Sequence, residues 1–221
     1  MDKKINLDAF YQNKRNYYII KGITSLIFLA FTVRFAYTMY ENHQEGKQLN
    51  FVNILLFLQE LVTFLIITFS RMPKDTNITI KSTILTTIAT YYFLVISFSD
   101  TEATRALMPL NFCVIIMLLG LIWQIISKMC LGRSFGILPA NRGIVDYGPY
   151  RFMRHPIYFG YLCTHMGFLL GSFSLWNFSV YAIVWTSQCF RILEEEKVLS
   201  RDPAYQEFKK KVRFRLIPFI F

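Results

Sequence analysis

Residues 107–130 read LMPLNFCVIIMLLGLIWQIISKMC, an apolar run whose only charged side chain is Lys128. An α-helix crosses the hydrocarbon core of a bilayer in about 20 residues, so the run has the length of one membrane span. Its apolar residues form a continuous block instead of a stripe at helical or strand spacing. The stretch therefore predicts a transmembrane helix with lipid around most of its circumference.

Similar blocks recur along the chain. The predicted spans are residues 17–39, 51–70, 78–98, 107–130, 156–171 and 174–190. Hydrophobic residues make up 54% of the 221 residues, more than a soluble domain of this length needs. No small-residue cleavage site follows the first block, so we expect it to be retained. The sequence predicts an all-α fold, a polytopic transmembrane helical bundle of about six spans. Four of them lie in an N-terminal membrane region, residues 1–130, and the rest in a C-terminal region, residues 131–221.

Lysine and arginine are divided unevenly between the two sides of this topology. Of the 24 such residues, 21 fall on the side that carries both termini, and the other three are Arg34, Lys47 and Arg105. By the positive-inside rule, both termini and the loop 131–155 face the cytosol. Topology thus accounts for the net charge of +10 without a nucleic-acid partner. We predict a multi-pass integral membrane protein whose active site faces the cytosol.

The cysteines do not form a metal-binding pattern. They are Cys113, Cys130, Cys163 and Cys189, all in or beside apolar blocks, with no CxxC motif and no Cys/His pair at metal-ligand spacing. No metal is predicted.

The loop 131–155 is dense in Gly, Pro, Arg and aromatic residues, which is typical of a structured loop that covers a ligand. Pro156 follows it at the expected first position of a helix, where its missing amide costs nothing. A helix N-terminus flanked by Arg151, Arg154 and His155 can hold a carboxylate or phosphate. The alternative is that these residues only mark the membrane boundary.

An acidic cluster, Glu194, Glu195 and Glu196, follows the last predicted span. Arg191 and Glu195 are four residues apart and share a helix face. Consecutive acids near the negative C-terminal end of a helix need a cationic partner. S-adenosylmethionine offers such groups in its sulfonium and ammonium, and its adenine could lie against Tyr147, Tyr150, Tyr158 or Tyr161. Other amphoteric nucleotides would satisfy the same pattern.

Two features inside the spans leave alternatives open. Glu60 lies in the second predicted span, either as a polar contact to a substrate or neighbouring helix or as a protonated or interfacial side chain. His165, in the fifth, is expected to form a helix–helix contact. Small residues at Gly160, Gly167 and Gly171 would let a neighbouring helix or a ligand approach that span closely.

Five short motifs occur in a fixed order over roughly residues 130–221. They are Leu131-Gly-Arg-Ser-Phe135, Gly148-Pro-Tyr150, Arg154-His-Pro-x-Tyr-x-Gly160, Arg191-x-x-x-Glu-Glu196 and a tail, Tyr205-x-x-Phe-x-x-x-Val-x-x-Arg-Leu-Ile-Pro218. In this order the chain resembles the isoprenylcysteine carboxyl methyltransferase family, which is related to membrane phospholipid methyltransferases.

The resemblance implies an S-adenosylmethionine-dependent methyltransferase that acts on a lipid-like acceptor. It implies catalytic roles for Arg191 and Glu195. The cofactor-binding residues that it implies are Tyr150, Arg154, His155, Pro156, Tyr158, Glu195 and Glu196. Glu194 falls outside the motif and is expected to be solvated surface.

Several alternatives to a prenylcysteine carboxylate as acceptor remain open. The enzyme could be a phospholipid N-methyltransferase, or it could methylate a small hydrophobic thiol or acid. A membrane reductase of the sterol-reductase type would use NADPH and need further basic residues for the 2′-phosphate. A non-catalytic membrane protein would need neither the concentrated loop nor the arginine–glutamate pair.

Overall fold

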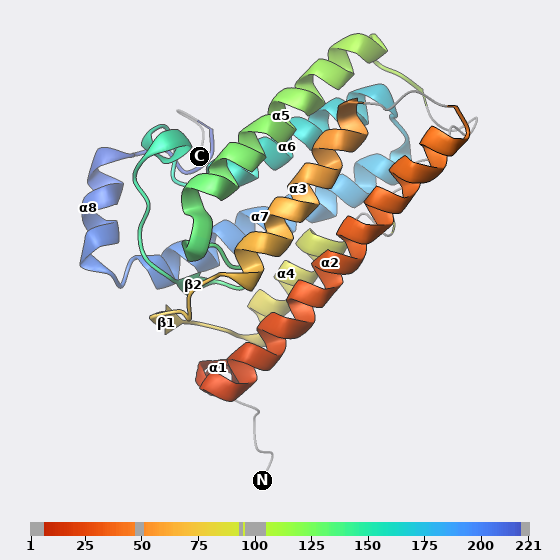
Figure 1. The fold of residues 1–221 in the computed structure, drawn as a ribbon. Coiled ribbons are helices and arrows are strands. Elements are labelled where there is room, and N and C mark those ends of the chain that lie inside the picture. The colour runs from red at the N-terminus through yellow and green to blue at the C-terminus, as the bar shows by residue number, and fades with distance from the viewer. Residues whose placement is uncertain (1–6, 47–50, 93–94, 96–104, 218–221) are drawn as a thin grey trace.

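The computed structural model describes residues 7–46, 51–92, 95 and 105–217, and its regular structure is almost entirely helical (Figure 1). The elements are α1 (Leu7–Gln12), α2 (Lys14–Gln44), α3 (Phe51–Thr68), β1 (Asp75–Thr76), α4 (Ile80–Tyr91), α5 (Leu110–Leu131), β2 (Ala140–Asn141), α6 (Pro156–Gly171), α7 (Leu175–Leu199) and α8 (Pro203–Lys211). Short 3₁₀ turns occupy Gly132–Ser134 and Gly148–Arg151. The predicted helical fold class is thus confirmed, with one small strand pair added to it.

The helices follow the predicted spans closely. α6 has the predicted bounds, whereas α7 continues nine residues beyond residue 190 and carries the acidic cluster out of the apolar block. The span predicted at 78–98 coincides with α4 as far as Tyr91, and most of its remainder lies outside the described residues. Among the described residues, two helices are long and apolar enough to cross a bilayer, Lys14–Gln44 and Leu110–Ser134. The total of six spans and the cytosolic orientation remain predictions.

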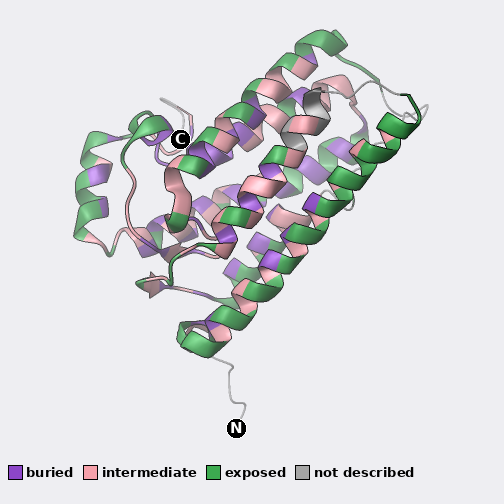
Figure 2. Ribbon diagram, in the orientation of Figure 1, coloured by how far each residue is buried: buried purple, intermediate pink, exposed green. Residues whose placement is uncertain are grey.

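Much of α2 is exposed (Figure 2), and large apolar side chains lie on its surface along most of its length. Ile23, Leu26 and Val33 are each more than half exposed. α5 also exposes large apolar side chains, among them Ile115 and Leu119. Apolar surface of this extent is rare on soluble proteins and is stable against lipid. Together with the length of the two helices, it indicates a membrane protein.

α5 and α6 pack with their backbones in close contact because glycines lie between them. A Cβ atom added to Gly160 would lie 2.8 Å from the carbonyl oxygen of Gly120, and one added to Gly167 would lie 2.7 Å from that of Cys113. The small-residue face predicted for residues 156–171 therefore receives a neighbouring helix. In membranes such close approach is a main source of helix association.

Replacing Gly160 with alanine should destabilise this interface. The new methyl group meets backbone that cannot move away, and overpacking of this kind costs about 1–3 kcal/mol. Gly171→Ala is the matched control on the same helix, because its Cβ would meet its nearest neighbour at an ordinary 3.4 Å. The midpoint of thermal unfolding in detergent should fall for Gly160→Ala and stay near wild type for Gly171→Ala. Equal midpoints for the two variants would contradict this packing.

α6 and α7 are joined by a short turn and face each other through large side chains. His165 Nε2 lies 2.6 Å from the hydroxyl of Tyr92, and its ring lies 4.7 Å from that of Tyr181 on α7. The helix–helix contact predicted for His165 is confirmed. The site of interest lies at one end of this bundle.

That end gathers α1, the β1–β2 pair, the loop before α6, and α8 (Figure 1). β1 and β2 pair antiparallel, with Asp75 opposite Asn141 and Thr76 opposite Ala140. The tail after α8 returns to the start of α6, where the amides of Arg154 and His155 donate to the carbonyls of Phe214 and Arg215 at 3.0 and 2.9 Å. This backbone pairing holds the residues at the N-terminus of α6 in place.

Candidate active site

A pocket lies between the loop 131–155, the first turn of α6, the last turns of α7, and α8. Its cavity volume is about 130 Å³, and it is partly open to solvent. Its charged and polar lining residues are Ser134, Arg142, Tyr150, Arg154, His155, Tyr158, Tyr161, Arg191, Glu195 and Tyr205. Aliphatic and phenylalanine side chains, among them Leu131, Ile144, Val145 and Phe208, supply the apolar wall.

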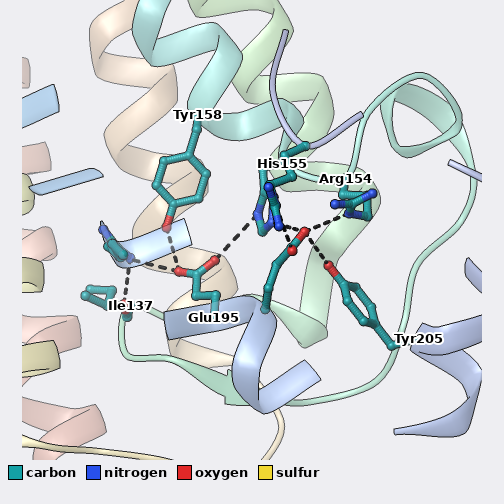
Figure 3. Close-up of polar contacts among 9 residues, drawn as sticks. Ile137, Arg154, His155, Tyr158, Glu195 and Tyr205 are labelled. Carbon is teal, nitrogen blue, oxygen red and sulfur yellow. Dashed lines mark hydrogen bonds and ion pairs between the residues drawn. The ribbon is translucent and has the colours of Figure 1, made fainter. Parts of the chain in front are cut away.

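The carboxylate of Glu195 lies at the centre of the polar contacts (Figure 3). The hydroxyl of Tyr158 donates to its Oε1 at 2.5 Å, and Nε of Arg191 lies 3.4 Å from the same oxygen. His155 Nδ1 lies 3.8 Å from Oε2. The first turn of α6 and the last turns of α7 thus present their functional groups to one point, as expected if residues of both motifs bind one cofactor.

Arg191 is held on three sides. Its Nη2 donates to the carbonyl of Ile137 at 2.6 Å, and its guanidinium lies 5.5 Å from the centre of the Tyr158 ring. The hydrogen bond ties the loop 131–155 to α7, and the ring contact adds a cation–π attraction. With Glu195 as its counter-ion, Arg191 has a fixed orientation at the pocket wall.

Glu196 makes a different set of contacts and is absent from the pocket lining. Its Oε1 accepts from Nε of Arg154 at 2.7 Å and from the hydroxyl of Tyr205 at 3.2 Å. Its Oε2 accepts from Nε of Arg215 at 2.9 Å. Nη1 of Arg154 also donates to two carbonyls of the tail, at 2.8 and 2.7 Å. Glu196 therefore fastens the tail and α8 to the start of α6.

Electrostatics at Glu196 favour the ionised form. Burial alone would raise the pKa of its carboxyl, but the hydrogen bonds from His155, Arg154 and Arg215 outweigh burial and hold the pKa well below its usual value. A charge this well compensated is a stable structural anchor.

Glu194, predicted to be solvated, is buried, which corrects that expectation. Its Oε1 lies 2.9 Å from Nζ of Lys197 and 3.4 Å from Nζ of Lys81. The two lysines are largely exposed, and Lys81 belongs to α4, which packs against α7. A single sequence could not reveal this, because burial here depends on a helix 113 residues away.

The remaining predicted residues divide into those that line the pocket and those that do not. Tyr150 is buried and lines it; burial, with a smaller contribution from Glu195, raises the pKa of its hydroxyl, which stays protonated. Pro156 is buried behind the lining and begins α6. Tyr147 is half-exposed, and its hydroxyl donates to the carbonyl of Cys130. Of the cations proposed to mark the membrane boundary, only Arg151 is exposed.

Sequence reasoning missed the role of Arg142, which lines the pocket as a buried cation. Its position in a loop already singled out as ligand-covering was the available signal. It also missed Phe208 and Tyr205, which complete the wall from α8. Both residues belong to the tail motif, and that membership was the available signal of a role at the site.

Residues 106–206 match the family model described as phospholipid methyltransferase, and this segment holds every predicted site residue. None of the curated proteins matches the chain. The matched segment begins with α5 and ends in α8, so it covers the helices and the loop that build most of the pocket. Over residues 106–206 the chain is similar to phospholipid methyltransferases, which points to a membrane methyltransferase.

Proposed function

We propose that the protein is an S-adenosylmethionine-dependent methyltransferase that modifies a lipid-like acceptor at the cytosolic face of a membrane. The observation that carries the proposal is the position of Glu195. One carboxylate faces a pocket of mixed polar and apolar lining, next to an arginine, a histidine and a tyrosine from two motifs. The family match over the same residues supports it.

The residues of the pocket fit the methyl donor by their chemistry. Glu195 would compensate the positive sulfonium and ammonium, and the apolar wall with Tyr150 would enclose the adenine. When bound, the donor supplies an electrophilic methyl group on a positively charged sulfur. The protein's own part is to orient the acceptor and to exclude water, since methyl transfer to a carboxylate needs little acid–base help.

Arg191 would hold an acidic acceptor group, because its guanidinium is fixed at the pocket wall by the carbonyl of Ile137. The acceptor's apolar tail would come from the bilayer side. Phe135 and Ile157 line the pocket and also pack with Phe28 of α2 and Ile67 of α3 in one apolar cluster. The pocket wall is thus continuous with the membrane-facing helices, which favours a lipid-like acceptor over a water-soluble one.

Titration calorimetry on the protein purified in detergent tests this function, with S-adenosylmethionine and NADPH as separate ligands. We expect saturable binding of S-adenosylmethionine and none of NADPH. NADPH is the necessary comparison because Arg142 adds a cation of the kind that a 2′-phosphate would require. Binding of NADPH alone would make the protein a reductase, and binding of neither ligand would favour a non-catalytic role.

A further inference from the structure

Arg142 is buried in the pocket wall without a carboxylate partner. Only 4% of its surface is exposed, and among residues 7–46, 51–92, 95 and 105–217 it forms no salt bridge. Its Nη2 donates to the hydroxyl of Tyr11 at 3.1 Å, and its Nε has no hydrogen-bond partner within that part of the chain. The other two arginines of the pocket each have a glutamate, Arg154 with Glu196 and Arg191 with Glu195.

Neighbouring residues leave space for the side chain of Arg142. A Cβ atom at Gly136 would overlap the guanidinium of Arg142, so only glycine leaves the space that it occupies. Tyr11, on α1, reaches the same guanidinium from 131 residues away in the sequence. The loop and α1 thus hold a cation at the pocket, next to the segment that also binds Arg191 through the carbonyl of Ile137.

A buried cation without a counter-ion is unfavourable, because its lost hydration is not replaced. Such a group is tolerated where a ligand supplies the opposite charge. A guanidinium suits carboxylate and phosphate oxygens because its N–H groups form a planar fork. Glu195 does not serve this purpose, since Arg191 already pairs with it.

We propose that Arg142 is the anion-binding group of this pocket and pairs with a carboxylate or phosphate that the ligand carries. The inference rests on the proposed function, in which the anion belongs either to the methyl donor's carboxylate or to the acceptor's acidic group. It distinguishes Arg142 from the other two arginines of the pocket, because Arg154 and Arg191 have internal counter-ions and Arg142 takes an external one.

The first experiment compares S-adenosylmethionine with its decarboxylated form by calorimetry on wild type and Arg142→Gln. If the anion is the donor's carboxylate, wild type should bind the intact donor at least tenfold more tightly, and the variant should bind both forms about equally. Arg142→Lys keeps the charge and should restore part of the preference. Arg133→Gln is the matched control, because it removes an exposed cation of the same loop that does not line the pocket.

The second experiment compares octanoate with uncharged octanol by their effect on the thermal unfolding midpoint. If the anion belongs to the acceptor, octanoate should raise the midpoint of wild type more than octanol does, and Arg142→Gln should lose that difference while keeping its affinity for both donor forms. This arm does not require donor binding, so it tests Arg142 even if the proposed function fails.

The unfolding midpoint of the ligand-free protein separates ligand binding from a structural role. Removing an uncompensated buried charge should leave the ligand-free midpoint of Arg142→Gln unchanged or higher. The inference is overturned if the variant keeps the preferences of wild type in both experiments, or if wild type shows no preference in either. Donor binding by wild type, with no effect of Arg142→Gln in either experiment, would overturn this inference alone and leave the proposed function standing.

Discussion

Glu195→Gln should weaken S-adenosylmethionine binding by at least tenfold, equal to a loss of about 1.4 kcal/mol. The substitution keeps the size of the side chain and its ability to accept from Tyr158. Among the described residues that line the pocket it removes the only negative charge, which is the group that would compensate the donor's sulfonium and ammonium. Methyl transfer should fall further, because Arg191 loses the carboxylate that orients it.

Glu194→Gln is the control for this experiment. Glu194 is the preceding residue on the same helix, but its carboxylate pairs with two exposed lysines outside the pocket. Pairs with exposed lysines contribute little, typically below about 1 kcal/mol, so affinity and stability should both stay near wild type. Calorimetry on the folded variants in detergent is the measurement. Equal affinity of wild type and Glu195→Gln would show that the donor site is placed wrongly.

Glu196→Gln should cause the largest loss of stability of the three glutamate variants. It leaves the buried guanidinium of Arg154 without its counter-ion and releases Arg215. Removing one partner of a buried pair costs about 3–5 kcal/mol. The attachment of the tail and α8 to the start of α6 should weaken, since Glu196 joins them through Arg154, Tyr205 and Arg215. Donor affinity should fall as a consequence, because α8 supplies Phe208 and Tyr205 to the pocket wall.

The pH dependence of stability tests whether the carboxylate of Glu196 forms these ion pairs. Because the pKa of Glu196 is lowered in the folded state, its contribution to stability is complete above its usual pKa of 4.5 and is lost as the pH falls below that value. The difference in unfolding midpoint between wild type and Glu196→Gln should be constant above about pH 5 and become smaller below pH 4.5. A difference that stays constant down to pH 3 would contradict the ion pairs at Glu196.

For the three consecutive glutamates, the sequence predicts the partner of one residue but not the partners of the other two. Spacing from Arg191 identified Glu195 as the residue that shares its helix face, and the structure places the two together. Successive residues on a helix point about 100° apart, so their neighbours are set by other elements. Glu194 meets α4, and Glu196 meets the tail, neither of which is close in the sequence.

The helical fold class and the positions of most helices were predictable because a bilayer imposes a length and an apolar composition on every segment that crosses it. The resemblance, which implies one cofactor site with residues from the start of α6 and the end of α7, also predicted that these ends meet. The position of Arg142 was not predictable. It depends on Tyr11 of α1 and on the space that Gly136 leaves, and no local pattern records a contact across 131 residues.

The sequence by itself determined which segments are apolar helices and which residue types gather near residues 131–196. Only the tertiary structure decided which of those charges are compensated within the protein and which one faces the pocket without a partner. The physical reason is that hydropathy and helical spacing are properties of neighbouring residues. The free energy of a charge depends instead on every group packed around it, wherever that group lies in the chain.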